Sequence, residues 1–144
     1  MIKNLSDAKF LKMTLEEIKN RISGICEEYK DYLEFAYLFG SMAKGETAPS
    51  SDVDIALYFR RSIGKDRFFD LGLAVQSDMC RALKSDVVDV VILNTVANLM
   101  LLDEIVRHGV ILFDGNEELR EEFEVSALHR AMDFKEQRKY LVGV

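Results

Sequence analysis

Two aspartates, Asp52 and Asp54, stand two positions apart in the run from 52 to 59, where apolar residues alternate with other types. This alternation predicts a β-strand with one buried face. Side chains two positions apart on a strand point the same way, with Cβ atoms roughly 7 Å apart. Two carboxylates so placed are suited to a pair of Mg²⁺ ions, since magnesium is commonly held by one or two carboxylates together with substrate phosphates. The pair therefore predicts metal-dependent chemistry on a phosphate-bearing substrate.

A third acid is expected from the run from 86 to 93, which reads as a buried strand rich in β-branched residues. Asp86 stands at its start, where water reaches an acid. Asp89 has two valines on either side, and a buried carboxylate among apolar neighbours is costly unless it meets a cation or hydrogen-bond donors. On this burial argument we predict Asp89 rather than Asp86 as the third member of the cluster.

A phosphate-binding turn is predicted at Gly40 and Ser41, directly after a short aromatic-rich strand over 35–39. Gly40 leaves room for a close phosphate approach, and Ser41 offers a hydroxyl and a backbone N–H at a possible helix N-terminus. Lys44 either positions a phosphate or is a solvated loop lysine. Ser51 either joins the nucleotide site or only caps the loop before the strand.

The remaining pattern alternates helices with strands, so the fold class is α/β or α+β. Thr14 with Glu17 predicts a capped helix start, Gly109 predicts a left-handed helix end, and Asn116 predicts another cap. The expected elements are helices over 14–30, 65–83, 99–108 and 116–140, and a strand over 110–113.

Bulk composition narrows the class of protein. The 144 residues are 49% hydrophobic and 31% charged, which predicts a single globular domain over 1–144. A net charge of −6 argues against a direct nucleic-acid partner. Cys26 and Cys80 form no zinc or redox motif. The sequence shows no signal peptide and no apolar run of membrane-spanning length, so we expect a cytoplasmic protein with no membrane partner.

The order and spacing of these motifs resemble the signature of the DNA polymerase beta-like nucleotidyltransferase superfamily. The chain has Gly40-Ser41, ten intervening residues, Asp52-x-Asp54 and then an acid in a later strand. The closer likeness is to the minimal members of this superfamily, the MNT antitoxins, in which Gly-Ser-x-Ala-Arg-Gly precedes Ser-Asp-x-Asp-Leu. Here Lys44 and Ile55 replace the arginine and the leucine. The resemblance continues through 101–113 and 123–140.

The resemblance implies a nucleotidyltransferase fold, a small mixed β-sheet flanked by helices, with a helical segment to about 33, a catalytic core over about 34–113 and a C-terminal helix over about 116–141. Its implied reaction transfers AMP from ATP to a tyrosine of a HEPN-domain RNase toxin, with Mg²⁺ and release of pyrophosphate. Asp52, Asp54 and Asp89 would be the catalytic metal ligands, and Gly40, Ser41, Lys44 and Ser51 would bind the nucleotide.

Two other functions stay open at this stage. The chain could be an antitoxin that neutralises its toxin by binding alone, or an enzyme that transfers a nucleotide to a small molecule. A calcium-binding EF-hand is excluded, because Leu57 stands where that loop needs glycine. The chain carries no evident HEPN arginine–histidine motif, so any toxin is a separate protein.

Overall fold

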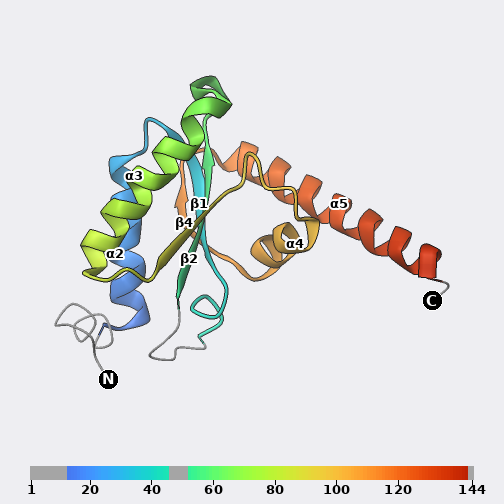
Figure 1. Cartoon of the computed structure of the whole chain (residues 1–144), viewed down its shortest axis with the longest axis horizontal. Coiled ribbons are helices and arrows are strands. Elements are labelled where there is room, and N and C mark those ends of the chain that lie inside the picture. Colours follow the sequence, from blue (N-terminus) through green and yellow to red (C-terminus); the bar gives the residue numbers. More distant parts are fainter. Residues whose placement is uncertain (1–12, 46–51, 143–144) are drawn as a thin grey trace.

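The computed structural model describes residues 13–45 and 52–142 (Figure 1). In chain order the elements are α2 (Leu15–Glu28), β1 (Leu33–Phe39), β2 (Val53–Phe59), a 3-10 helix η1 (Arg61–Ile63), α3 (Lys65–Leu83), β3 (Val88–Ile92), α4 (Leu99–His108), β4 (Val110–Asp114) and α5 (Glu117–Val142).

The strands form one mixed sheet in the order β3-β2-β1-β4. β2 runs parallel to β3, whereas β1 is antiparallel to both β2 and β4. The end of β1 and the starts of β2 and β3 therefore lie at the same end of the sheet. This arrangement confirms the expected mixed sheet flanked by helices.

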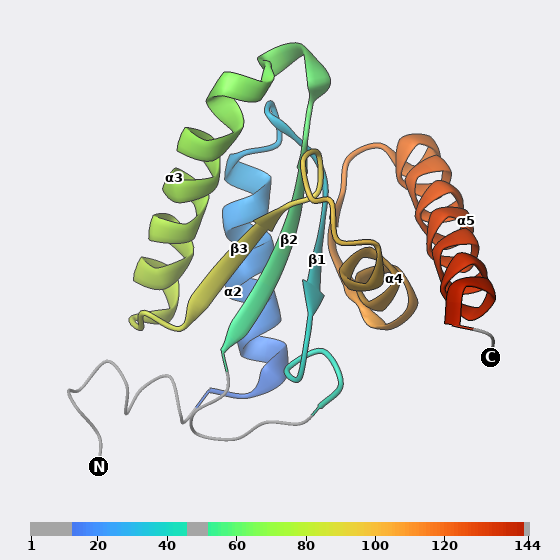
Figure 2. The same cartoon turned by 45° about the vertical axis from the view of Figure 1, so that its right-hand side comes forward.

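Two helix layers cover the sheet. Figure 2 shows α2 and α3 on one side and α4 and α5 on the other. β2 alternates between the two cores: Val53, Ile55 and Leu57 pack toward α2 and α3, and Ala56 and Tyr58 pack toward α4 and α5. The predicted alternation of this strand is confirmed, and it puts Asp54 on the α4 and α5 side.

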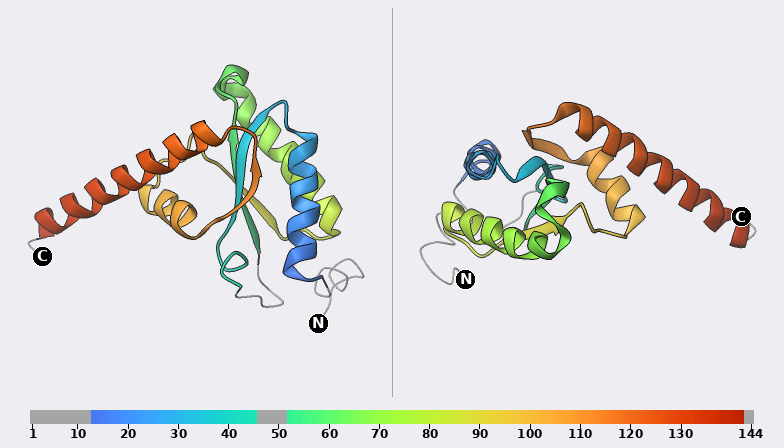
Figure 3. Two further views of the ribbon diagram at one scale, coloured as in Figure 1. Left: turned by 180° about the vertical axis from the view of Figure 1, so that it is seen from behind. Right: turned by 90° about the horizontal axis from the view of Figure 1, so that it is seen from above.

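The predicted helix starts are confirmed. The Thr14 side chain accepts a hydrogen bond from the Glu17 N–H at 3.1 Å, and Asn116 Oδ1 accepts one from the Leu119 N–H at 3.1 Å. α5 then continues beyond α4, away from the sheet (Figure 3). No helix in the described ranges 13–45 and 52–142 is long and apolar enough to cross a membrane.

The predicted left-handed end at Gly109 is wrong, because Gly109 has φ −71° and leads straight into β4. The glycine has a different use: a Cβ there would collide with the Ile105 carbonyl oxygen. The left-handed helix end occurs instead at Lys84, which follows α3 with φ 54°.

Candidate active site

Three of the predicted acids are brought to one end of the sheet by strand register. Asp54 lies opposite Phe39 of β1 on one side and opposite Asp89 of β3 on the other. Adjacent strands are about 4.8 Å apart, so Asp54 and Asp89 are immediate neighbours. Asp52 directly precedes β2 and is exposed.

The electrostatics of Asp54 reflect this gathering of negative charge. Its pKa is raised above the usual value, first by burial, then by the charge of Asp89 and then by that of Asp52. Like charges at short range disfavour the ionised form of the group between them. A cation placed among the three carboxylates would relieve that repulsion.

The burial argument for Asp89 is wrong, although Asp89 does lie beside Asp54. Asp89 is exposed, because β3 is an edge strand and the two helices on that face pack mainly against β1. Asp86 precedes β3 and lies outside its pairing with β2. Register, not burial, distinguishes Asp89 from Asp86.

Gly40 brings the backbone against the acid on the neighbouring strand. It has φ +77°, a conformation that residues with a Cβ rarely adopt, and an added Cβ would collide with Asp54 Oδ2. Glycine at this position therefore lets the end of β1 approach the Asp54 carboxylate closely.

The segment after Gly40 is a pair of overlapping turns rather than the start of a helix. The Lys44 N–H donates to the Ser41 carbonyl oxygen at 3.1 Å, and the Gly45 N–H donates to the Met42 carbonyl oxygen at 3.2 Å. Met42 is buried in the core under α2 and α3 and anchors the turns. Ser41 is half-buried at the same end of the sheet as the acids.

Lys44 forms an ion pair with α4 that no pattern in the sequence predicts. Its Nζ lies 2.6 Å from Glu104 Oε1 on α4, and the hydrogen bond from Lys44 lowers the pKa of Glu104. The ion pair ties the turns to α4, and the Lys44 side chain stays partly exposed. Ser51, the other predicted nucleotide contact, lies outside the described residues.

The two arginines after β2 lie at the opposite end of that strand from the acids. Arg60 Nε is 3.6 Å from Glu34 Oε1, and Arg61 Nε donates to the Tyr58 hydroxyl at 3.1 Å. Both arginines are exposed and mark the end of the strand that lies away from the acids.

The acidic side chains fit a divalent cation that arrives with its substrate. Within residues 13–45 and 52–142, no group of three or more acidic, histidine or cysteine side chains is arranged to hold a metal ion by itself. Magnesium does not require one, because it retains several waters and takes phosphate oxygens together with one or two carboxylates. Asp52, Asp54 and Asp89 are the residues that would hold it.

Comparisons with known proteins identify the family and the fold. The family model "Polymerase beta, Nucleotidyltransferase" matches residues 20–118. No curated protein matches the chain. Among solved structures, one chain of a toxin–antitoxin with AMP-PNP is 25% identical with a TM-score of 0.69, over 87% of this chain and 95% of that chain.

Two further structures share the fold. A mutant toxin–antitoxin MntA–HpeT is 23% identical with a TM-score of 0.70, over 87% of this chain and 95% of that chain. A tri-AMPylated Shewanella oneidensis HEPN toxin in complex with MNT antitoxin is 22% identical with a TM-score of 0.66, over 90% of this chain and 97% of that chain. With the family model covering more than half of the sequence, the chain belongs to the polymerase beta nucleotidyltransferase family.

Proposed function

We propose that this chain is a cytoplasmic antitoxin that transfers AMP from ATP to a tyrosine hydroxyl of a cognate HEPN-domain RNase toxin, with Mg²⁺ and release of pyrophosphate. The observation that carries the proposal is the placement of Asp52, Asp54 and Asp89 at one end of the sheet, where Gly40 lies against Asp54. The similar Shewanella oneidensis complex, which holds an AMPylated HEPN toxin, supports the choice of partner and acceptor.

In this proposal each residue has a stated task. Gly40 and Ser41 receive the triphosphate, because the positive φ of Gly40 keeps side-chain atoms out of the approach. Lys44, beside the same turns, contributes positive charge toward the phosphates. Asp52, Asp54 and Asp89 would hold a magnesium ion, which would supply positive charge to the phosphates and favour ionisation of an attacking hydroxyl.

The transfer itself is an in-line displacement at the α-phosphorus. The tyrosine oxygen forms a bond to that phosphorus, and the bond from phosphorus to the oxygen bridging to the β-phosphate breaks. The pyrophosphate leaves with the electron pair of the broken bond, and the tyrosine proton passes to the Asp89 carboxylate. Asp89 is suited to this role because it is exposed on an edge strand, where an acceptor from another protein can reach it.

The test incubates the chain with Mg²⁺, ATP labelled in its AMP moiety and the purified HEPN protein encoded by the adjacent gene. We expect label on a toxin tyrosine with the wild type and none with Asp52→Ala/Asp54→Ala. Asp86→Asn is the matched control, because it removes a nearby exposed acid outside the strand pairing, and it should transfer normally. Undiminished transfer by the double variant, or toxin protection without any transfer, would overturn the proposal; the latter result would identify an antitoxin that acts by binding.

A further inference from the structure

A pocket of about 410 Å³ lies at the end of the sheet opposite the acids. Its walls come from the end of β2, η1, the segment after β3 and the first half of α5. Asp54 and Tyr58 are four residues apart on β2, so their Cα atoms are separated by about 13 Å. The pocket is therefore spatially distinct from the acidic site. Its volume falls within the range of small-molecule sites, roughly 300–1,000 Å³.

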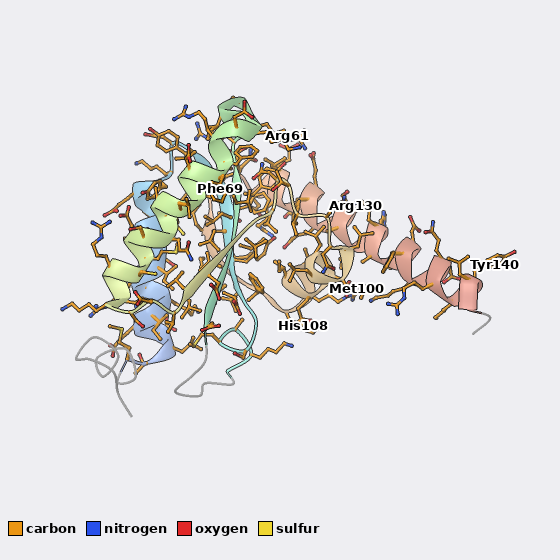
Figure 4. All side chains as sticks on the ribbon, in the orientation of Figure 1. Arg61, Phe69, Met100, His108, Arg130 and Tyr140 are labelled. Carbon is orange, nitrogen blue, oxygen red and sulfur yellow. The ribbon has the colours of Figure 1, made fainter. Side chains whose placement is uncertain are left out.

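Two guanidinium groups line this pocket, Arg61 from η1 and Arg130 from α5. Figure 4 labels both toward the upper part of the molecule, whereas His108, the last residue of α4, is labelled lower down. Arg61 uses Nε to bond the Tyr58 hydroxyl, which fixes the group and leaves its terminal nitrogens available. Arg130 has no hydrogen bond or ion pair to any residue in the described ranges.

The floor of the pocket is rigid and partly aromatic. The Asn94 side chain accepts a hydrogen bond from the Phe59 N–H and donates one to the Phe59 carbonyl oxygen, at 2.8 Å each, so its orientation is fixed by the backbone. Phe123 packs against Tyr58 with ring centroids 5.5 Å apart. Ser126 adds a hydroxyl to the wall. These groups leave the two arginines as the principal donors for a ligand.

We propose that this pocket is a second ligand site, which binds a phosphate or carboxylate group through the guanidinium groups of Arg61 and Arg130. A guanidinium presents a planar set of N–H donors that matches the oxygens of phosphate or carboxylate in a bidentate manner. With Glu122 as the one acid on the wall, the lining carries a net charge of +1 from two arginines and one glutamate. The anionic group belongs either to a free small molecule or to a side chain of a bound protein.

Glu122 is the internal competitor for the anion. The pKa of Arg61 is raised by its hydrogen bond with Tyr58 and also by the charge of Glu122, which places this carboxylate within electrostatic reach of Arg61. An incoming anion is repelled by that carboxylate. Removing the charge of Glu122 should strengthen anion binding, whereas removing either arginine should weaken it.

The experiment titrates inorganic phosphate, and separately acetate, into the full chain at constant ionic strength with a chelator present, and follows backbone amide and arginine Nε–H shifts by NMR. We expect saturable shifts around the pocket for at least one anion. Affinity should fall about ten-fold or more in Arg61→Gln and in Arg130→Gln, as for loss of a charge-assisted contact, and should rise in Glu122→Gln. Arg67→Gln is the matched control, an exposed arginine on α3 outside the pocket.

The NMR measurements distinguish anion binding at this pocket from binding at the acidic site. Asp54→Asn should keep the phosphate shifts at the pocket, so the result does not depend on nucleotidyl transfer. Phosphate is also tested for competition with the purified HEPN protein for binding to the wild-type chain. Competition would identify the anionic group that occupies the pocket as a side chain of the partner, and its absence would identify it as a free anion. No saturable shift with either anion, unchanged affinity in both arginine variants, or an equal loss in Arg67→Gln would overturn the proposal.

Discussion

Gly40→Ala tests whether the close approach of β1 to Asp54 serves catalysis or only folding. Gly40 has φ +77° and Gly45 has φ +76°, but a Cβ at Gly40 would meet Asp54 Oδ2, whereas a Cβ at Gly45 would meet no atom within 4 Å. The left-handed conformation destabilises a folded residue that has a Cβ by roughly 1–2 kcal/mol. Replacing glycine with alanine also reduces the conformational entropy of the unfolded chain, which offsets about 0.4–1 kcal/mol of this cost. Each variant should therefore lower the free energy of unfolding by about 1 kcal/mol.

The two variants should differ in activity. The collision at Gly40 involves the end of the Asp54 side chain, which can rotate away at little cost to folding but then no longer faces Asp89. We expect Gly40→Ala to lose most of its ATP-dependent labelling and Gly45→Ala to retain it at equal stability. Urea unfolding measures the stabilities, and carbon NMR of the Asp54 carboxyl checks its displacement. Equal labelling by the two variants would refute the idea that Gly40 positions this acid.

Three other outcomes follow from the charges of the described residues. Burial and neighbouring carboxylates raise the pKa of Asp54, so the folded state binds the Asp54 proton more tightly than the unfolded state does. The free energy of unfolding should therefore fall as the pH rises from about 3.8 through the raised pKa. Asp54→Asn should be more stable than wild type at pH 7 in urea unfolding, yet inactive in the labelling assay. Asp103 is 7% exposed and accepts hydrogen bonds from Arg107 at 2.8 Å and Lys135 at 3.2 Å, so Asp103→Asn should lower the free energy of unfolding by about 1–3 kcal/mol, whereas Lys135→Met should cost less. Lys44→Ala should change stability by less than about 1 kcal/mol, since its pair with Glu104 is partly exposed, but should raise the KM for ATP in the labelling assay; an unchanged KM would remove Lys44 from the nucleotide site.

Local sequence signals predicted the elements well because the forces that decide them are local. The alternation of β2, the Thr14 cap and the Asn116 cap each depend on residues within a few positions. The same signals placed Asp54 on this strand, and Asp52 lies next to its start. These features could be predicted before any tertiary arrangement was known.

Features that depend on distant parts of the chain could not be predicted in this way. The exposure of Asp89 follows from the edge position of β3 and from where α4 and α5 pack, neither of which is encoded near residue 89. The sequence predicts a left-handed cap at Gly109, but the backbone there is extended and leads directly into β4. Glu104 and its pair with Lys44 join segments far apart in the sequence, and no pattern in either segment indicates the contact.

The central claim is that the acids beside Gly40 carry nucleotidyl transfer, and the position of the transferred label tests it most directly. The purified chain is incubated with Mg²⁺ and its HEPN partner, with ATP labelled either at the α-phosphate or at the γ-phosphate. Our account predicts covalent label on the partner only from the α-phosphate, with pyrophosphate released and no transfer by Asp54→Asn. Transfer of the γ-label, or transfer of the α-label that survives in Asp54→Asn, would contradict it.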